Sequence, residues 1–245
     1  MDRQQISRLA HADHPIAAPL DDGSVHRLLT RAVPGDGAHV LDLGCGGGEW
    51  LLRALRAYPG LTAEGVDTSG SALDRARAQA TRLAVGDRLT LHHRDAARFT
   101  AAHRFDLVLC VGSTHAFGGL SATLAAARAH LTPQGRVLVG DGYWERPPSS
   151  EAVDMLGDLA DLPTTLDRVV ADGWTPVGGH ISTRQELDDY EWSWTGALAD
   201  WALRHPDDPD RAQVLETAGA HRESWLRGYR DTLGFLCLVL RPTHA

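Results

Sequence analysis

The stretch that decides the fold is Val-Leu-Asp-Leu-Gly-Cys-Gly-Gly-Gly-Glu-Trp at positions 40–50. Its apolar beginning predicts the end of a buried strand, and the residues after Gly48 predict the start of a helix. The glycines between them lack Cβ atoms, so they allow a sharp turn and let a ligand approach the backbone. A strand, a glycine turn and a helix in this order are typical of folds that bind a ligand over the carboxyl ends of parallel strands.

The rest of the chain repeats this pattern. Short apolar runs alternate with stretches rich in Ala, Leu and Arg, which favour helix, and turn signals containing Pro and Gly separate them. We expect strands at 39–43, 62–67, 89–92, 105–110, 136–141, 174–182 and 233–240, with helices at 49–58, 71–84 and 120–131. Such β-α-β repeats predict an α/β fold with a doubly wound, mostly parallel seven-stranded sheet.

A chain of 245 residues can bury one full core, and α/β domains often exceed 200 residues. We therefore expect a single domain over residues 1–245, with an N-terminal helical segment at 1–33. The core should cover about 30–145, 172–182 and 232–241, and a helical cap inserted near the C-terminus should cover about 146–171 and 183–231. Two cap helices are indicated by apolar residues at helical spacing in 185–204 and 210–231. Six of the seven tryptophans lie in this last part, either as its core or as the lining of a pocket.

Charge and composition exclude several classes of function. The chain has 32 acidic and 24 basic residues and no basic run, which argues against a nucleic-acid partner. It contains no lysine, so a Walker-A, Schiff-base or pyridoxal-phosphate lysine is excluded. No apolar run approaches the ~20 residues of a membrane helix, so we expect no membrane partner. Cys45, Cys110 and Cys237 are widely spaced, which predicts reduced thiols in a cytoplasmic protein and no metal site.

Two acids near the glycines distinguish between possible cofactors. The dinucleotide pattern G-x-G-x-x-G would need glycine at position 49, where this chain has Glu49. A carboxylate there would also oppose a pyrophosphate at the positive end of the helix. Asp42, two residues before Gly44, places negative charge where a cationic ligand could bind. These features favour S-adenosylmethionine (SAM), which carries a sulfonium and an ammonium group, over NAD.

The glycine stretch resembles the first motif of the class I, Rossmann-like, SAM-dependent methyltransferases. Four later segments resemble further motifs of this family in the same order: Gly-Val-Asp-Thr-Ser at 65–69, Asp-Ala at 95–96, Phe-Asp-Leu-Val-Leu-Cys at 105–110 and Pro-Gln-Gly-Arg at 133–136. In the last of these Gln134 replaces the usual glycine. The resemblance covers residues 30–145 well and the remainder only in general plan.

This resemblance implies a set of cofactor contacts. The family places the acid at position 67 on the ribose hydroxyls, and the acid and amide at positions 95 and 96 on the adenine. The expected cofactor-binding residues are Asp42, Gly44, Cys45, Gly46, Gly48, Asp67, Thr68, Asp95, Ala96, Cys110 and Val111. Other interpretations remain open: Asp67 as a helix cap (although Ser69 suits that role better), Asp95 as a turn former, and Glu49 as a contact of the ammonium or as a favourable helix start. We interpret Cys45 and Cys110 as packing residues.

The methyl acceptor is expected over the carboxyl ends of the strands, facing the sulfonium. The Gly-flanked loop 111–119 supplies His115, and an imidazole is suited to proton removal at neutral pH. His115 could instead bond a loop carbonyl. Our candidate catalytic residues are His115, Asp141 and Tyr143, and the candidate acceptor-binding residues are His14, His115, Trp144, Tyr190 and Trp194.

Two further segments indicate the class of acceptor. His-Ala-Asp-His-Pro at 11–15 resembles a segment of bacterial small-molecule methyltransferases. After the fourth strand, Val-Gly-Ser-Thr at 111–114 does not resemble the (Asn/Asp)-Pro-Pro-(Tyr/Phe/Trp) motif of nucleic-acid methyltransferases.

The hypothesis is therefore a cytoplasmic SAM-dependent methyltransferase that acts on an N, O or C atom of a small molecule in specialised metabolism and produces S-adenosylhomocysteine (SAH). A non-catalytic SAM-binding regulator, an NAD(P) oxidoreductase and a protein methyltransferase are the alternatives. The sequence leaves the acceptor open, and it does not distinguish a monomer from a homodimer.

Overall fold

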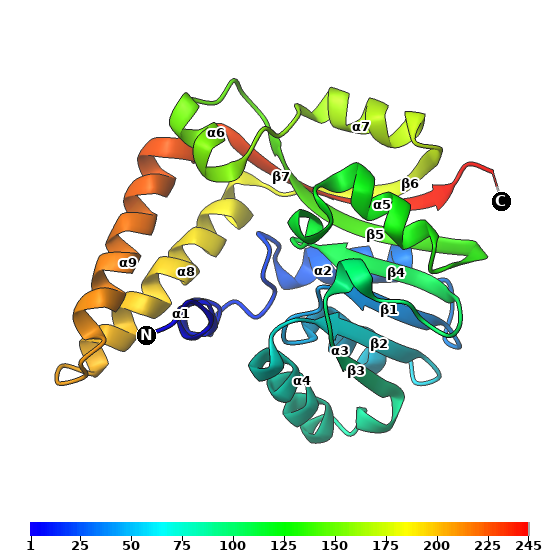
Figure 1. The fold of residues 1–245 in the computed structure, drawn as a ribbon, viewed down its shortest axis with the longest axis horizontal. Helices are drawn as coiled ribbons and strands as arrows, with labels where there is room; N and C mark the ends of the chain where they lie inside the picture. The colour runs from blue at the N-terminus through cyan, green and yellow to red at the C-terminus, as the bar shows by residue number, and fades with distance from the viewer. Residues whose placement is uncertain (245) are drawn as a thin grey trace. The chain divides into compact units, whose positions relative to one another are not determined.

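A computed structural model describes residues 1–244, apart from the side chains of residues 3 and 4. One sheet has the strand order β3-β2-β1-β4-β5-β7-β6 (Figure 1). Its strands are β1 (His39–Leu43), β2 (Thr62–Asp67), β3 (Leu89–His93), β4 (Phe105–Val111), β5 (Leu131–Trp144), β6 (Trp174–Ile181) and β7 (Leu233–Pro242). The α-helices are α1 (Arg3–Ala10), α2 (Asp22–Ala32), α3 (Glu49–Ala57), α4 (Gly70–Arg82), α5 (Leu120–Arg128), α6 (Ser150–Leu156), α7 (Leu162–Ala171), α8 (Arg184–Arg204) and α9 (Arg211–Glu223). The predicted α/β fold with a mostly parallel, seven-stranded sheet is confirmed.

Residue contacts divide the chain into two compact units, which are described separately. The sheet unit comprises Asp21–Asp141, Pro163–Ile181 and Leu236–Ala245, and the helical unit comprises Met1–Leu20, Gly142–Leu162 and Ser182–Phe235. This division differs from our expectation at several places, two of which involve whole helices. Helix α7, expected in the cap, groups with the sheet unit and buries Thr165 and Val169. The expected N-terminal segment is split, because α1 groups with the helical unit and α2 with the sheet unit.

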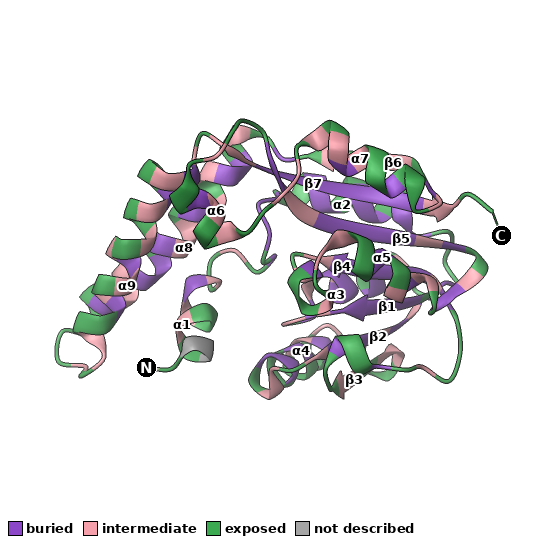
Figure 2. Cartoon of the chain, turned by 45° about the horizontal axis from the view of Figure 1, so that its top comes forward, coloured by how far each residue is buried: buried purple, intermediate pink, exposed green. Residues whose placement is uncertain are grey.

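In the sheet unit, parallel pairing brings the ends of several strands to one edge. Asp42 of β1 is in register with Gly65 of β2 and with Leu109 of β4. β2 and β3 are also parallel, as are β4 and β5, whereas β6 and β7 are antiparallel. Strands β1, β4 and β5 are largely buried (Figure 2), as expected for a parallel sheet covered by helices. Because these strands are parallel, the side chains at their carboxyl ends lie along one edge of the sheet.

The helical unit is built on α8, α9 and α1. Helices α8 and α9 lie side by side (Figure 1), and α1 also packs on α8. Small side chains let these helices approach closely, and the buried cluster between them consists of Ala10, Leu198, Ala202, Val214 and Ala218. The predicted helix at 185–204 is confirmed as α8, which begins with a capping box between Thr183 and Glu186.

Two boundaries differ from the sequence-based expectation for tertiary reasons. The helix expected at 120–131 ends at Arg128, because Leu131 pairs with Phe105 of β4 and already belongs to β5. The helix expected at 210–231 is α-helical only to Glu223 and becomes π-helical over Ser224–Tyr229. This wider turn carries Trp225 and Tyr229, which join the buried cluster that also contains Trp144 and Ala152.

Across residues 1–244, no helix combines the length and the apolar composition needed to cross a bilayer.

Candidate active site

The loop between β1 and α3 has the backbone conformation that its glycines predict. Gly44, Gly46 and Gly48 have φ angles of +89°, +50° and +73°, a region that favours glycine. A Cβ atom added at Gly44 would lie 2.5 Å from the Ser113 side chain, so Gly44 is also required for close packing. At Gly46 an added Cβ would meet no heavy atom within 4 Å. The loop therefore leaves open space beside Gly46, as a ligand cradle requires.

Asp67, at the end of β2, is bound to this loop. Its Oδ2 accepts a hydrogen bond from the Gly46 amide at 2.8 Å, and its Oδ1 accepts one from the Ser69 amide at 2.7 Å. The α4 helix is capped by Ser69, whose Oγ accepts from the Ala72 amide at 3.3 Å. Asp67 is therefore not the α4 cap. Each carboxylate oxygen retains a lone pair, so Asp67 can also accept bonds from ribose hydroxyls.

Asp42 has an environment that is costly without a ligand. It is 3% exposed, and its Oδ2 has no hydrogen-bond partner among the described residues. Burial, together with the charge of Asp67, raises the pKa of Asp42 to about 8. A buried carboxylate without a partner is destabilising unless a positive group compensates it. This orphaned oxygen and the open cradle at Gly46 fit a cofactor that carries positive charge, as SAM does.

The two cysteines of the site are buried thiols. Burial, with added charges from Asp42 and Asp67 at Cys45 and from Asp42 and Asp141 at Cys110, raises the pKa of both groups. The Sγ atom of Cys45 lies 2.8 Å from where a Cβ on Gly65 would be, so it fills the space that this glycine leaves. Thiols held protonated in this way are poor nucleophiles, which supports the packing interpretation.

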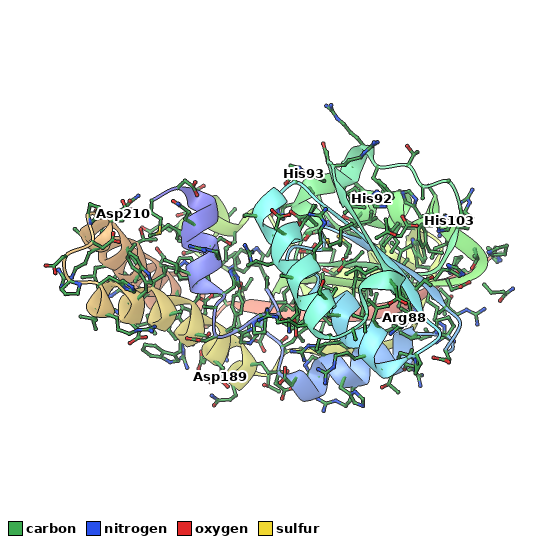
Figure 3. The ribbon with its side chains drawn as sticks, turned by 90° about the horizontal axis from the view of Figure 1, so that it is seen from below. Arg88, His92, His93, His103, Asp189 and Asp210 are labelled. Carbon is green, nitrogen blue, oxygen red and sulfur yellow. The ribbon has the colours of Figure 1, made fainter. Side chains whose placement is uncertain are left out.

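Asp95 and Thr68 lie near the adjacent strand ends. Asp95 accepts a hydrogen bond from the Ala97 amide at 2.9 Å and begins the 3-10 turn Ala96–Arg98, so its turn-forming role is observed. The exposed Thr68 accepts a bond at its carbonyl from His93 Nε2 at 2.8 Å. His92 instead pairs with Glu64, at 2.7 Å (both histidines are labelled in Figure 3). Among residues 1–244 no group of His, Cys, Asp and Glu side chains could hold a metal ion.

The loop after β4 reaches the glycine loop through a residue that we did not include among the site residues. Ser113 Oγ donates to the Gly44 carbonyl at 3.2 Å. The available signal was a hydroxyl directly after Gly112 in the Gly-flanked loop that we had singled out. His115 follows in the 3-10 turn Thr114–Phe117 and is exposed. Val111, at the end of β4, is half-buried.

Glu49 and Asp141 also lie in the sheet unit. Glu49 Oε1 forms an ion pair with Arg53 Nε at 2.8 Å in the first turns of α3. This contact agrees with the helix-start interpretation of Glu49 and does not test a contact with the cofactor's ammonium group. Asp141 is half-buried and close enough to Cys110 to raise its pKa.

Two of the predicted acceptor residues come together in the helical unit. The rings of His14 and Tyr190 meet edge to face at 5.4 Å. The Tyr190 hydroxyl lies 3.0 Å from His11 Nε2, and His11 Nδ1 lies 2.8 Å from the Ser7 carbonyl oxygen. Since a carbonyl only accepts, Nδ1 of His11 carries the proton, and in the neutral ring the Tyr190 hydroxyl donates to Nε2. Burial and the charge of Glu191 raise the pKa of Tyr190, so this hydroxyl stays protonated.

The other three predicted residues of the helical unit have different surroundings. Tyr143 is buried against Gly234, and burial with the charge of Glu145 raises its pKa. Trp144 is buried, and its Nε1 has no hydrogen-bond partner among the described residues. Trp194 stacks on His221 with ring centroids 3.9 Å apart. None of these three contacts the His14–Tyr190 pair through a hydrogen bond or ring contact that the structure records.

Comparison with known proteins identifies several similar chains. A family described as a methyltransferase domain matches residues 40–135, which contain the glycine loop, Asp67 and Asp95. YjhP of Escherichia coli K12, an uncharacterized protein, is 29% identical over 243 residues, which are 96% of this chain and 97% of that protein. A 27-O-demethylrifamycin SV methyltransferase of Amycolatopsis mediterranei is 30% identical over 218 residues, covering 84% and 77% of the two chains.

One solved structure matches nearly the whole chain. It is a SAM-dependent methyltransferase of Geobacter sulfurreducens in complex with S-adenosyl-L-homocysteine, with a TM-score of 0.87 and 27% identity. The match covers 97% of this chain and 98% of the other. These similarities agree with the inference that the glycine loop and Asp42 bind a positively charged cofactor.

Proposed function

Because this chain belongs to the class I SAM-dependent methyltransferases, we propose that it transfers a methyl group to a small-molecule acceptor in specialised metabolism. The observation that carries this proposal is the arrangement of His11, His14 and Tyr190, which presents half-buried rings and an oriented imidazole in the helical unit. The name of the Amycolatopsis relative describes methylation of a small molecule at oxygen, which supports the same class of acceptor.

The sheet unit contains the residues that we assign to the cofactor. The Gly44–Gly48 loop exposes backbone to it, Asp67 accepts bonds from the ribose, and Asp95 with the Ala96 amide contacts the adenine. Asp42 compensates the positive charge. When bound, SAM supplies an activated methyl group whose bond to sulfur breaks as the acceptor atom forms a bond to the methyl carbon. The chain's own contribution is to place the acceptor in line and to exclude water, and positioning alone can supply most of the rate enhancement.

An acceptor that carries a proton needs a base to receive it. We assign this role first to His115, because its loop is fixed to the glycine loop by the bond from Ser113 to Gly44. His14 is also oriented for acceptor contact: its Nδ1 lies 2.7 Å from the Ile16 carbonyl oxygen, so Nδ1 carries the proton and Nε2 of the neutral ring has a free lone pair.

The remaining candidates have narrower roles. The raised pKa of Tyr143 favours a hydrogen-bond donor over a base. The buried Nε1 of Trp144, which has no partner among the described residues, is the donor that we assign to an acceptor oxygen. Asp141 stays a candidate for orienting the acceptor, and Trp194 and Tyr190 supply aromatic surface. We place the reaction in the cytoplasm, a proposal supported by three buried cysteines, none of which forms a disulfide in the described part of the chain.

The proposal is tested by incubating the protein with methyl-radiolabelled SAM and a bacterial metabolite extract. We expect label in a small organic product that mass spectrometry identifies, and none with the Gly46→Val variant. Label recovered in protein or nucleic acid instead would contradict a small-molecule acceptor. SAM binding without transfer to any fraction would favour the regulatory alternative.

A further inference from the structure

Asp42 interacts with one neighbouring acid and two thiols. It faces Asp67 from β2, and its own charge acts on Cys45 in the glycine loop and on Cys110 in β4. Asp141, on β5, also acts on Cys110. Every titratable group that these interactions bring to Asp42 is therefore an acid or a neutral thiol. None of these side chains is positively charged, so none of them compensates a negative charge on Asp42 in addition to that of Asp67.

The hydrogen bonding of Asp42 also favours its protonated form. Its Oδ2 is buried and has no partner among the described residues, while both oxygens of Asp67 accept bonds from backbone amides. The charged form of an acid is disfavoured by burial and by a neighbouring charge, and Asp67 has the amide bonds that stabilise its own charge. Of this pair, Asp42 is therefore the acid that holds a proton, in agreement with its pKa of about 8.

We propose that Asp42 is a neutral carboxylic acid in the ligand-free protein and ionises when SAM binds, so that binding releases a proton and favours SAM over SAH. The O–H bond of Asp42 breaks, the proton passes to solvent, and the carboxylate faces the positive charge of the ligand. SAM carries one positive charge more than SAH because of its sulfonium. Loss of this charge after methyl transfer lets Asp42 regain its proton, which weakens the binding of the product. The inference concerns the cofactor and is independent of the acceptor class proposed above.

The direct test is calorimetric titration of the protein with SAM and with SAH at pH 7, in two buffers that differ in ionisation enthalpy. An acid with a pKa of about 8 is about 0.9 protonated at pH 7, so SAM should release up to about 0.9 proton, and SAH clearly less. Because the ligand-free form holds the proton, the affinity for SAM should rise with pH. We expect about a ninefold gain from pH 6 to 7, about a fivefold gain from pH 7 to 8, and a plateau above about pH 9.

Asp42→Asn preserves the shape of the side chain and cannot ionise. Because Asp42 is neutral in the ligand-free protein, this variant should fold. It should bind SAM without proton release, with little dependence on pH and with a reduced preference over SAH. The matched control is Asp106→Asn, which changes a half-buried acid on β4 whose Oδ2 accepts from the His39 amide at 3.0 Å. This control should release protons as the wild type does.

An independent measurement needs no variant. The infrared difference spectrum of the wild type on adding SAM should show loss of a protonated carboxyl band and gain of a carboxylate band. The proposal is overturned if the wild type releases no proton on binding SAM, if SAH releases as many as SAM, or if Asp42→Asn releases the same number as the wild type.

Discussion

The sheet unit and the helical unit differ in how their functional residues are encoded. In the sheet unit, the residues assigned to the cofactor follow consecutive strands, and the bond that joins Asp67 to Gly46 links positions only 21 residues apart. In the helical unit, the bond between His11 and Tyr190 links positions 179 residues apart. A repeated βα unit brings strand ends together by topology alone, whereas the helical contacts depend on how separate segments pack.

The difference predicts two kinds of sensitivity to mutation. Changes at the sheet edge should affect cofactor binding strongly, because backbone angles and single carboxylates define that site. Changes in the helical unit should affect stability and acceptor use more gradually, because several side chains share each contact. The following predictions test this difference, in order of decreasing effect.

Gly46→Val should abolish SAM binding while the protein stays folded. A β-branched side chain resists a φ of +50°, and its Cβ would point into space that the protein leaves open for the ligand. Isothermal titration calorimetry measures the binding, and circular dichroism measures the fold. Gly47→Ala is the matched control, since an added Cβ there also meets no atom within 4 Å and the φ angle of Gly47 is not positive. Unchanged SAM affinity in folded Gly46→Val would contradict the assignment of the glycine loop to SAM binding.

His115→Ala should leave SAM affinity nearly unchanged and lower kcat by roughly 10²–10⁴-fold, the range for loss of a general base. If His115 only orients the acceptor, KM should rise more than kcat falls. The control is His103→Ala, which removes another exposed histidine that pairs with Glu64 at 3.2 Å and should not alter the kinetics. Loss of SAM binding with turnover retained at saturating SAM would place His115 in the cofactor site instead.

Asp67→Ala should weaken SAM binding by about 1–3 kcal/mol, the scale of hydrogen bonds lost from a charged group. The bond to the Gly46 amide is lost as well, so part of the effect comes from a looser loop. Asp74→Ala is the control, because Asp74 is an exposed acid on α4 that pairs only with Arg77 among the described residues. A change of less than about twofold for Asp67→Ala would reduce Asp67 to a turn residue.

Tyr190→Phe should cost about 0.5–1.5 kcal/mol of unfolding free energy, because it removes the hydroxyl that donates to His11. Urea unfolding measures the loss. Tyr58→Phe in the sheet unit is the control, as its hydroxyl forms no hydrogen bond among the described residues and should give almost no change. An equal loss in both variants would show that the His11–Tyr190 bond contributes nothing to the helical unit.

The sequence predicted most of the sheet unit because strand ends, glycine turns and acids follow a short repeat. The bounds of β1 and β2 agree with the prediction, and Ser69 is the α4 cap that its position suggested. The early start of β5 at Leu131 was missed, because an Ala-rich segment favours helix until pairing with Phe105 overrides that propensity.

The helical unit was predicted only in outline. Spacing of apolar residues identified α8, but a regular 3.6-residue period cannot predict the π-helical turn at Ser224–Tyr229. The bond between Tyr190 and His11 could not be predicted either, because neither segment contains a pattern that identifies the other as its partner. Ser113 was missed because its hydroxyl, although it directly follows Gly112, does not identify the Gly44 carbonyl as its partner.

The most direct test of the central claim is a crystal structure of this protein with SAH. The account predicts SAH in the Gly44–Gly48 loop, with its ribose hydroxyls on the Asp67 carboxylate, its adenine amino group at Asp95 and its methionine part beside Asp42. SAH bound away from this loop, or bound there with its ribose out of hydrogen-bonding reach of Asp67, would contradict the account.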